Sequence, residues 1–256
     1  MKKYGLIIDE QKPEDFVFGA SLPMEIINES GDWHEWLPNK EIQNLNGVEP
    51  YACVIYTILN CAETLIKKQY GEERNYSDRF LATVVGTRGK GCSPKDACQF
   101  LRKVGVVPQD VWPFDESVTS EEVFFTPPSP KLYELAQDFN KEWDFGYEIV
   151  PSNPASITAA LKCSPLLMSV PAWTEQDGKF FRPDGQRDNH ATSLFYELQE
   201  AFRRVFDSYD APHIKDVEWG CMPSVVFRFR IKKRHKEPES WWKILLDIIK
   251  KLFKHE

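Results

Sequence analysis

The 256-residue sequence lacks any long hydrophobic run. No segment supplies the roughly 18 or more consecutive apolar residues that a transmembrane helix requires. The chain starts with Met1-Lys2-Lys3, but acidic residues from Asp9 onward end the short apolar stretch that follows, so it does not resemble a signal peptide. We therefore expect a cytoplasmic location, with association with a virion or with a membrane surface as alternatives.

An excess of positive charge is also missing. The formal net charge is −7, which argues against non-specific binding of nucleic acid, and we expect no nucleic-acid partner. Hydrophobic residues make up 42% and charged residues 28% of the chain, as in an ordinary globular protein. The length allows one large domain or two lobes that share a cleft.

Cysteine pairs with the spacing of a zinc site are absent. Cys92 and Cys98 are separated by five residues, without the C-x-x-C pattern, and we expect no metal and no cofactor. The six cysteines could form three disulfides in a secreted protein, but a free nucleophile among them would leave five, which cannot all pair. We interpret Cys61 as a small buried apolar residue.

The periodicity of apolar residues divides the chain into a helical first half and a strand-rich second half. Residues 1–49 are expected to be extended and rich in loops. Helices are predicted from Pro50, over 77–85, 94–104 and 131–142, and a small one over 154–161. Strands are predicted over 147–150, 165–170, 190–198, 203–209 and 224–231. The pattern indicates an α+β protein with two lobes and a site between them.

Cys53 lies near the start of the helix that follows Pro50. Apolar residues recur at helical spacing after it, and Gly71 ends the run. At the beginning of a helix, free N–H groups and the helix dipole favour an anion. This position therefore favours a thiolate and makes Cys53 a candidate nucleophile; the alternative is a small core residue.

Among the five histidines, His190 has the best setting for a general base. A polar turn enters an apolar strand there, 137 residues after Cys53 (190 − 53). Asp207 ends the next predicted strand, 17 residues further on (207 − 190), so antiparallel pairing could bring the two side chains together. Asp207 would then orient the imidazole and stabilise its charged form, unless it is simply a turn residue.

With these residues in place, the chain resembles the papain-like cysteine peptidases, in particular bacterial and phage-type members. The spacing from Cys53 to His190 falls in the roughly 130–150 residue window of that family. The stretches that carry the resemblance are Gln43 with Cys53, Asn60 and Glu63; Ser77 to Leu81, Gly91 and Gly105 to Phe114; Asn189-His190-Ala191; and Asp207-Ser208-Tyr209. The resemblance implies a two-lobe fold, with a helical lobe and an antiparallel β lobe that enclose the active site.

The resemblance also implies that Gln43 stabilises the oxyanion together with the backbone N–H of Cys53. Gln43 precedes Cys53 by ten positions, more than the family pattern, so the intervening loop must bulge. Asn46 is nearer the usual spacing and is the rival. The sequence departs from the family further, because Asp207-Ser208-Tyr209 replaces Asn-Ser-Trp and the cysteine before the nucleophile is missing. The missing cysteine agrees with a reducing compartment.

We expect three segments: an extended N-terminal arm over 1–42, a peptidase domain over 43–235 and a basic amphipathic helix over 236–256. Within the domain, the helical lobe covers about 50–145 and the β lobe about 146–235. In the last segment, residues 240–254 combine an apolar stripe with lysines. Such a helix can bind a membrane surface or a protein partner, or pack on its own domain.

The leading hypothesis is a cysteine endopeptidase that acts on a polypeptide substrate through Cys53, His190, Asp207 and Gln43. A second hypothesis is a catalytically silent papain-fold binding or assembly module. A third is a Cys-His-Asp amidase that acts on cell-wall peptides.

Overall fold

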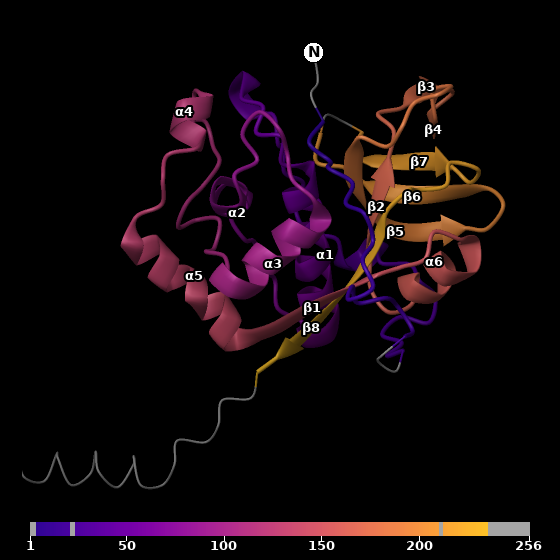
Figure 1. Ribbon diagram of the computed structural model, residues 1–256, viewed down its shortest axis with the longest axis horizontal. Coiled ribbons are helices and arrows are strands. Elements are labelled where there is room, and N and C mark those ends of the chain that lie inside the picture. Colours follow the sequence, from indigo (N-terminus) through magenta and orange to yellow (C-terminus); the bar gives the residue numbers. More distant parts are fainter. Residues whose placement is uncertain (1–3, 21–23, 210–211, 235–256) are drawn as a thin grey trace, which may run out of the picture.

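The computed structural model describes residues 4–20, 24–209 and 212–234. Most of the helices gather on one side of the molecule and most of the strands on the other (Figure 1). The helices are α1 (Cys53–Tyr70), α2 (Asp78–Val85), α3 (Pro94–Val104), α4 (Glu121–Phe124), α5 (Pro130–Glu142) and α6 (Pro154–Leu161), with 3-10 turns η1 (His34–Trp36) and η2 (Leu45–Gly47). The predicted α+β class is confirmed.

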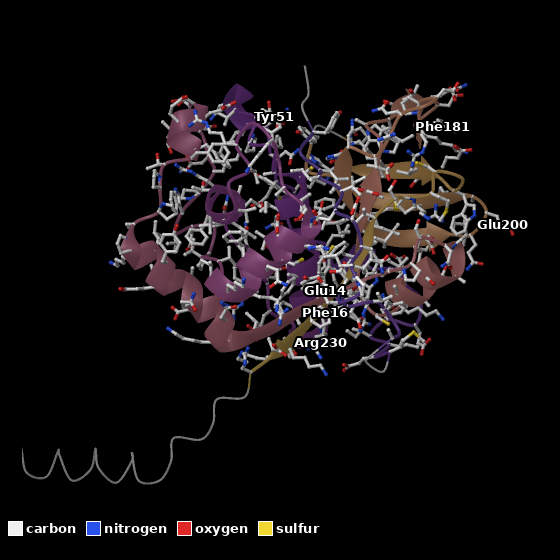
Figure 2. The ribbon with its side chains drawn as sticks, in the orientation of Figure 1. Glu14, Phe16, Tyr51, Phe181, Glu200 and Arg230 are labelled. Atoms are coloured by element: carbon white, nitrogen blue, oxygen red, sulfur yellow. The ribbon has the colours of Figure 1, made fainter. Side chains whose placement is uncertain are left out.

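The strands form one eight-stranded sheet, in the order β1-β8-β2-β5-β6-β7-β4-β3. Neighbouring strands are antiparallel except for β4 and β7, which pair in parallel. The strands are β1 (Trp143–Ile149), β2 (Leu166–Val170), β3 (Thr174–Gln176), β4 (Lys179–Phe181), β5 (His190–Leu198), β6 (Phe202–Phe206), β7 (Ile214–Glu218) and β8 (Val226–Lys233). Figure 2 places the labelled Tyr51 on the helical side and Phe181 and Glu200 on the sheet side.

Helix α1 is the central element of the core. Its first fourteen residues, Cys53 to Ile66, are all buried, since one side of the helix faces the other helices and the opposite side faces the sheet. The Ser193 hydroxyl of β5 donates to the Thr57 carbonyl of α1 at 3.4 Å. Asn60 Nδ2 of α1 donates to Ser208 Oγ at 3.3 Å. These contacts fix α1 against the strands that carry His190 and the 207–209 turn.

Several predicted boundaries are wrong. The strand predicted over 203–209 ends at Phe206, and the strand predicted over 224–231 runs from Val226 to Lys233. The first helix begins at Cys53 rather than at Pro50, because Tyr51 has φ +54°, a left-handed conformation that a helix cannot include. The strand predicted from residue 147 begins at Trp143, directly after α5 ends at Glu142, with no proline or glycine to mark the change. The short strands β3, β4 and β7 and the helix α4 were not predicted.

All six cysteines lie within the described residues, and all are free and buried. Burial raises the pKa of the Cys61 thiol to about 12, so this thiol behaves as an apolar core residue. Within the described ranges, no helix is both long enough and apolar enough to cross a membrane. The amphipathic helix predicted for 236–256, with its binding stripe over 240–254, lies outside the described residues.

Candidate active site

Cys53 is the first residue of α1, with Ala52 as the N-cap. Ala52 provides no side-chain cap, so no capping side chain takes up the N–H groups of the first turn. The backbone at the start of α1 therefore favours a negative charge on the Cys53 sulfur. The side chain is only 1% exposed, in a setting shielded from water.

His190 and Asp207 meet as the sequence predicts. His190 is the first residue of β5 and Asp207 directly follows β6, and these two strands pair antiparallel. His190 Nε2 lies 2.9 Å from Asp207 Oδ1, and both side chains are 2% exposed. This contact holds the ring in one orientation and leaves its other nitrogen for a different partner.

The second ring nitrogen of His190, Nδ1, is buried and has no hydrogen-bond partner among the described residues. Burial disfavours the charged imidazole, but Asp207 and then Cys53 outweigh it and raise the pKa of His190 to about 9. Cys53 of α1 contributes to this rise through its interaction with the imidazole of β5. Burial also opposes the Asp207 carboxylate, yet His190 and Lys215 hold the pKa of Asp207 well below its ordinary range.

Three aromatic rings surround the His190 imidazole. The ring centroids of Tyr4, Tyr209 and Trp173 lie 5.0, 5.2 and 5.8 Å from that of His190. They come from the N-terminal segment, the 207–209 turn and the loop after β2. Because these rings exclude water, electrostatic interactions with His190 are stronger than they would be at the surface.

Gln43 lies beside the same turn. Its backbone N–H donates to the Ser208 carbonyl at 2.9 Å, and its side chain is fully buried. Neither Nε2 nor Oε1 of this amide has a hydrogen-bond partner among the described residues. A buried amide without a partner is costly, and functional sites are where such groups occur.

Asn46, the rival of Gln43, is engaged elsewhere. Its Nδ2 donates to the carbonyls of Asp115 and Val118 at 3.2 and 3.1 Å. The backbone of Asn46 has φ +55° within the 3-10 turn η2, so the loop before Cys53 bulges, as the ten-residue spacing requires. Of the two amides, only that of Gln43 remains available to a ligand.

The N-terminal segment passes between the helical side and the sheet side (Figure 1). Its main chain binds both sides: Leu6 N–H donates to the Asn189 carbonyl at 3.2 Å, and Ile7 N–H donates to the Cys92 carbonyl at 3.0 Å. Cys92 N–H in turn donates to the Gly5 carbonyl at 2.9 Å. The contact is close, since a Cβ on Gly5 would lie 2.0 Å from the Tyr51 carbonyl oxygen.

The structure adds two residues that sequence patterns did not indicate, Lys215 of β7 and Glu49 of the bulged loop. Lys215 Nζ donates to Asp207 Oδ2 at 2.8 Å. The Glu49 carboxylate accepts the Tyr51 N–H at 3.0 Å and also contacts the Tyr209 hydroxyl. The sequence of β7, Ile-Lys-Asp-Val-Glu, does not alternate between apolar and charged residues, although Lys215 and Val217 are its buried positions.

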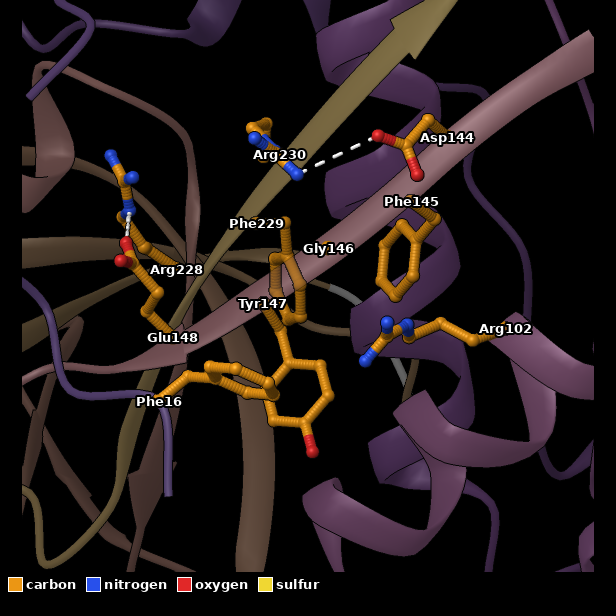
Figure 3. Close-up of a pocket in the computed structure, with 10 residues that line it drawn as sticks. All are labelled: Phe16, Arg102, Asp144, Phe145, Gly146, Tyr147, Glu148, Arg228, Phe229 and Arg230. Carbon is orange, nitrogen blue, oxygen red and sulfur yellow. Dashed lines mark hydrogen bonds and ion pairs between the residues drawn. The ribbon is translucent and has the colours of Figure 1, made fainter. Parts of the chain in front are cut away.

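The described residues include no cluster of three or more histidine, cysteine or acidic side chains that could hold a metal ion. A cavity of about 240 Å³ lies on β1 and β8 (Figure 3). It is lined by aromatic rings and by Arg102 and Arg230, and its lining includes none of Cys53, His190 and Asp207. The chemistry-bearing residues therefore lie apart from this cavity.

Comparison of the sequence with protein-family models and with curated proteins finds no match. Solved structures do match. Xylellain, a cysteine protease from Xylella fastidiosa, superposes with a TM-score of 0.66 at 16% identity, over 90% of this chain and 96% of xylellain.

Two further matches are proforms by their names. The proform of the Amb a 11 cysteine protease, a ragweed pollen allergen, gives a TM-score of 0.56 at 14% identity, over 85% of this chain and 68% of the allergen. Digestive procathepsin L 3 from the larval midgut of Tenebrio molitor gives 0.54 at 12% identity, over 84% and 72%. At these identities the similarity establishes the fold, and the chain has the papain-like cysteine peptidase fold.

Proposed function

We propose that the chain is a cysteine endopeptidase in which Cys53 is the nucleophile, His190 the acid and base, and Asp207 the group that orients His190. The observation that carries the proposal is the buried His190, which Asp207 holds at 2.9 Å and whose pKa Cys53, at the start of α1, helps to raise. The neighbours of the fold, described as cysteine proteases, support the same reaction class.

In the proposed reaction, the Cys53 thiolate attacks the carbonyl carbon of a peptide bond. The negative charge moves to the carbonyl oxygen, where Gln43 Nε2 and the Cys53 N–H donate hydrogen bonds. His190 gives its proton to the nitrogen of the departing amine, and the C–N bond breaks, which leaves a thioester on Cys53. Water then attacks the thioester while His190 accepts its proton, and the acid and the free thiolate are released.

The N-terminal segment supports a polypeptide as the substrate. Residues 5–7 bind Cys92 and Asn189 through main-chain hydrogen bonds next to His190. Main-chain bonding of this kind accepts an extended peptide with little regard for its side chains. A substrate would take the place of this segment in part or in full.

The test is hydrolysis of casein by the full chain, together with covalent labelling by a thiol-reactive peptide electrophile and mapping of the labelled site by mass spectrometry. We expect label on Cys53 and loss of hydrolysis and labelling in Cys53→Ala. The matched control is Cys61→Ala, a buried cysteine two turns along the same helix, which should retain both. Hydrolysis by Cys53→Ala at the wild-type rate would refute the assignment.

The same assay separates the other two hypotheses. A chain that cleaves peptidoglycan fragments but not casein would be an amidase of cell-wall peptides, a reaction that the acidic Asp207 also suits. A chain that binds neither the electrophile nor a substrate would be a silent module.

A further inference from the structure

Lys215 is a buried lysine directed at the rear of the candidate triad. Its side chain is 6% exposed, and Nζ donates to Asp207 Oδ2 at 2.8 Å and to the Pro212 carbonyl at 2.6 Å. Asp207 thus uses its two oxygens on two different cations, Oδ1 on His190 and Oδ2 on Lys215.

Two aromatic rings lie near the Lys215 ammonium. Nζ lies 5.7 Å from the ring centroids of both Trp173 and Phe180. An ammonium group in such a place is expensive unless a partner of opposite charge compensates it. The strand pairing supplies that partner, because Lys215 of β7 lies opposite Val205 of β6, two residues before Asp207.

The contact between Lys215 and Asp207 relates to a difference that the sequence already shows. Asp207 is acidic, whereas the papain-like pattern has asparagine, a neutral amide, at this position. A lone carboxylate buried beside the imidazole would stabilise its charged form strongly. A histidine that acts as an acid and then as a base must also release the proton. A second cation on the same carboxylate weakens its hold on that proton.

We propose that Lys215 is a positioning residue that offsets part of the negative charge of Asp207, so that the Asp207–Lys215 pair retains the proton of His190 less strongly than a lone carboxylate would. The inference rests on the proposed function. It predicts that removing either residue alone is worse than removing both.

The other groups that face this pair come from several elements. Cys53 of α1 and Tyr4 of the N-terminal segment face His190, and the Tyr209 hydroxyl contacts Glu49. The Tyr209 N–H lies 3.3 Å from Asp207 Oδ1, and the His213 ring contacts the Asp207 carbonyl at 3.0 Å. Every variant described below keeps these groups, so differences between variants report on the charges at positions 207 and 215.

The experiment measures kcat/KM for a peptide substrate against pH in the full chain. Lys215→Met leaves an uncompensated negative charge, which disfavours the thiolate and retains the imidazolium proton. The acidic limb of the bell-shaped profile, which reports the thiolate, and the alkaline limb, which reports the imidazolium, should both move to higher pH. The expected shift is about one pH unit, or about tenfold in each protonation equilibrium. Asp207→Asn removes the negative charge and keeps the Lys215 ammonium, so both limbs should move to lower pH.

The double variant Asp207→Asn/Lys215→Met should return both limbs to within about half a unit of wild type and recover most of the rate. Lys232→Met, a lysine that is 48% exposed on β8, is the matched control and should leave the profile unchanged. A purely structural role would lower the melting temperature and the rate without moving the limbs.

The rate of iodoacetamide alkylation at Cys53, mapped by mass spectrometry and measured against pH, reports the same two protonation equilibria without peptide turnover. If wild type is alkylated at Cys53 no faster than at its other cysteines and cleaves no peptide, the proposed function fails. If wild type is active and folded Lys215→Met and Asp207→Asn both keep the wild-type limbs, the role of Lys215 fails alone. Should Lys215→Met not fold, the downward shift in Asp207→Asn and its reversal in the double variant decide the question.

Discussion

The hydroxyl of Tyr209 lies 2.9 and 2.8 Å from the two carboxylate oxygens of Glu49. Glu49 also accepts the N–H of Tyr51, whose backbone is in the left-handed region two residues before Cys53. The Tyr209 ring in turn packs against His190. The Glu49 carboxylate therefore connects the backbone just before Cys53 with one of the aromatic rings that surround His190.

We predict that Tyr209→Phe lowers kcat and the stability of the chain. The change removes a buried hydrogen bond to a charged group, worth roughly 1.5–3 kcal/mol. Thermal unfolding and peptide kinetics measure the two effects. Tyr133→Phe, a 40% exposed tyrosine of α5, is the control and should change neither. Equal melting temperatures for Tyr209→Phe and wild type would show that the contact with Glu49 stabilises nothing.

Gln43 and Asn46 should respond in opposite ways to removal of their amides. Gln43→Ala should lower kcat about 10²–10³-fold with little change in KM, the usual loss for one oxyanion donor. Asn46→Ala should cost about 1 kcal/mol of stability, because its amide bonds backbone carbonyls, and should leave kcat near wild type. Steady-state kinetics on both variants decide the assignment, and the reverse pattern would transfer the role to Asn46.

Gly5→Ala should increase the activity of the full chain. A Cβ at this position would lie 2.0 Å from the Tyr51 carbonyl oxygen, so the N-terminal segment could not keep its place between the two sides. The initial rate of peptide hydrolysis without prior processing is the measurement. Ile8→Ala, at a 43% exposed side chain of the same segment, is the control. A lower rate in Gly5→Ala than in Ile8→Ala would mean that the segment assists the site rather than covering it.

The stability of the chain should fall as the pH rises from about 6.5 to about 9. The pKa of His190 is raised to about 9 in the folded state, above the ordinary value of 6.5, so its contribution is fully present below 6.5 and disappears as the pH passes 9. The lowered pKa of Asp207 acts in the opposite range, and its contribution is lost in acid. Urea unfolding of wild type and His190→Gln across this range isolates the effect: the difference between them should shrink towards pH 9, and a constant difference would contradict the prediction.

Residues marked by local patterns could be found from the sequence. The helix start identified Cys53, and the passage from a polar turn into an apolar strand identified His190. The spacing of the next strand end then identified Asp207. Each signal is local to the secondary-structure element that carries the candidate residue, and the antiparallel pairing of β5 and β6 brings His190 and Asp207 together.

Residues that depend on distant pairing could not be found. Glu49 and Tyr209 are 160 positions apart, and the Tyr4 ring, which packs against His190, comes from the N-terminal segment. Lys215 contacts Asp207 only because of the register in which β6 pairs with β7. The left-handed backbone at Tyr51, which moved the helix start to Cys53, is imposed by the turn and its bond to Glu49, since tyrosine itself has no preference for it.

The direct passage from α5 into β1 has a mechanical consequence. β1 follows Glu142 without a connector and pairs with β8 over its whole length, so the same sheet that carries His190 extends beneath the helices. The junction of α5 and β1 offers no linker on which the two sides could swing apart, and a cut there would leave β1 hydrogen-bonded to β8. Under the proposed function, a long peptide would reach the site by displacing the N-terminal segment, and the rate of that displacement, rather than any opening of the two sides, would limit access to the site.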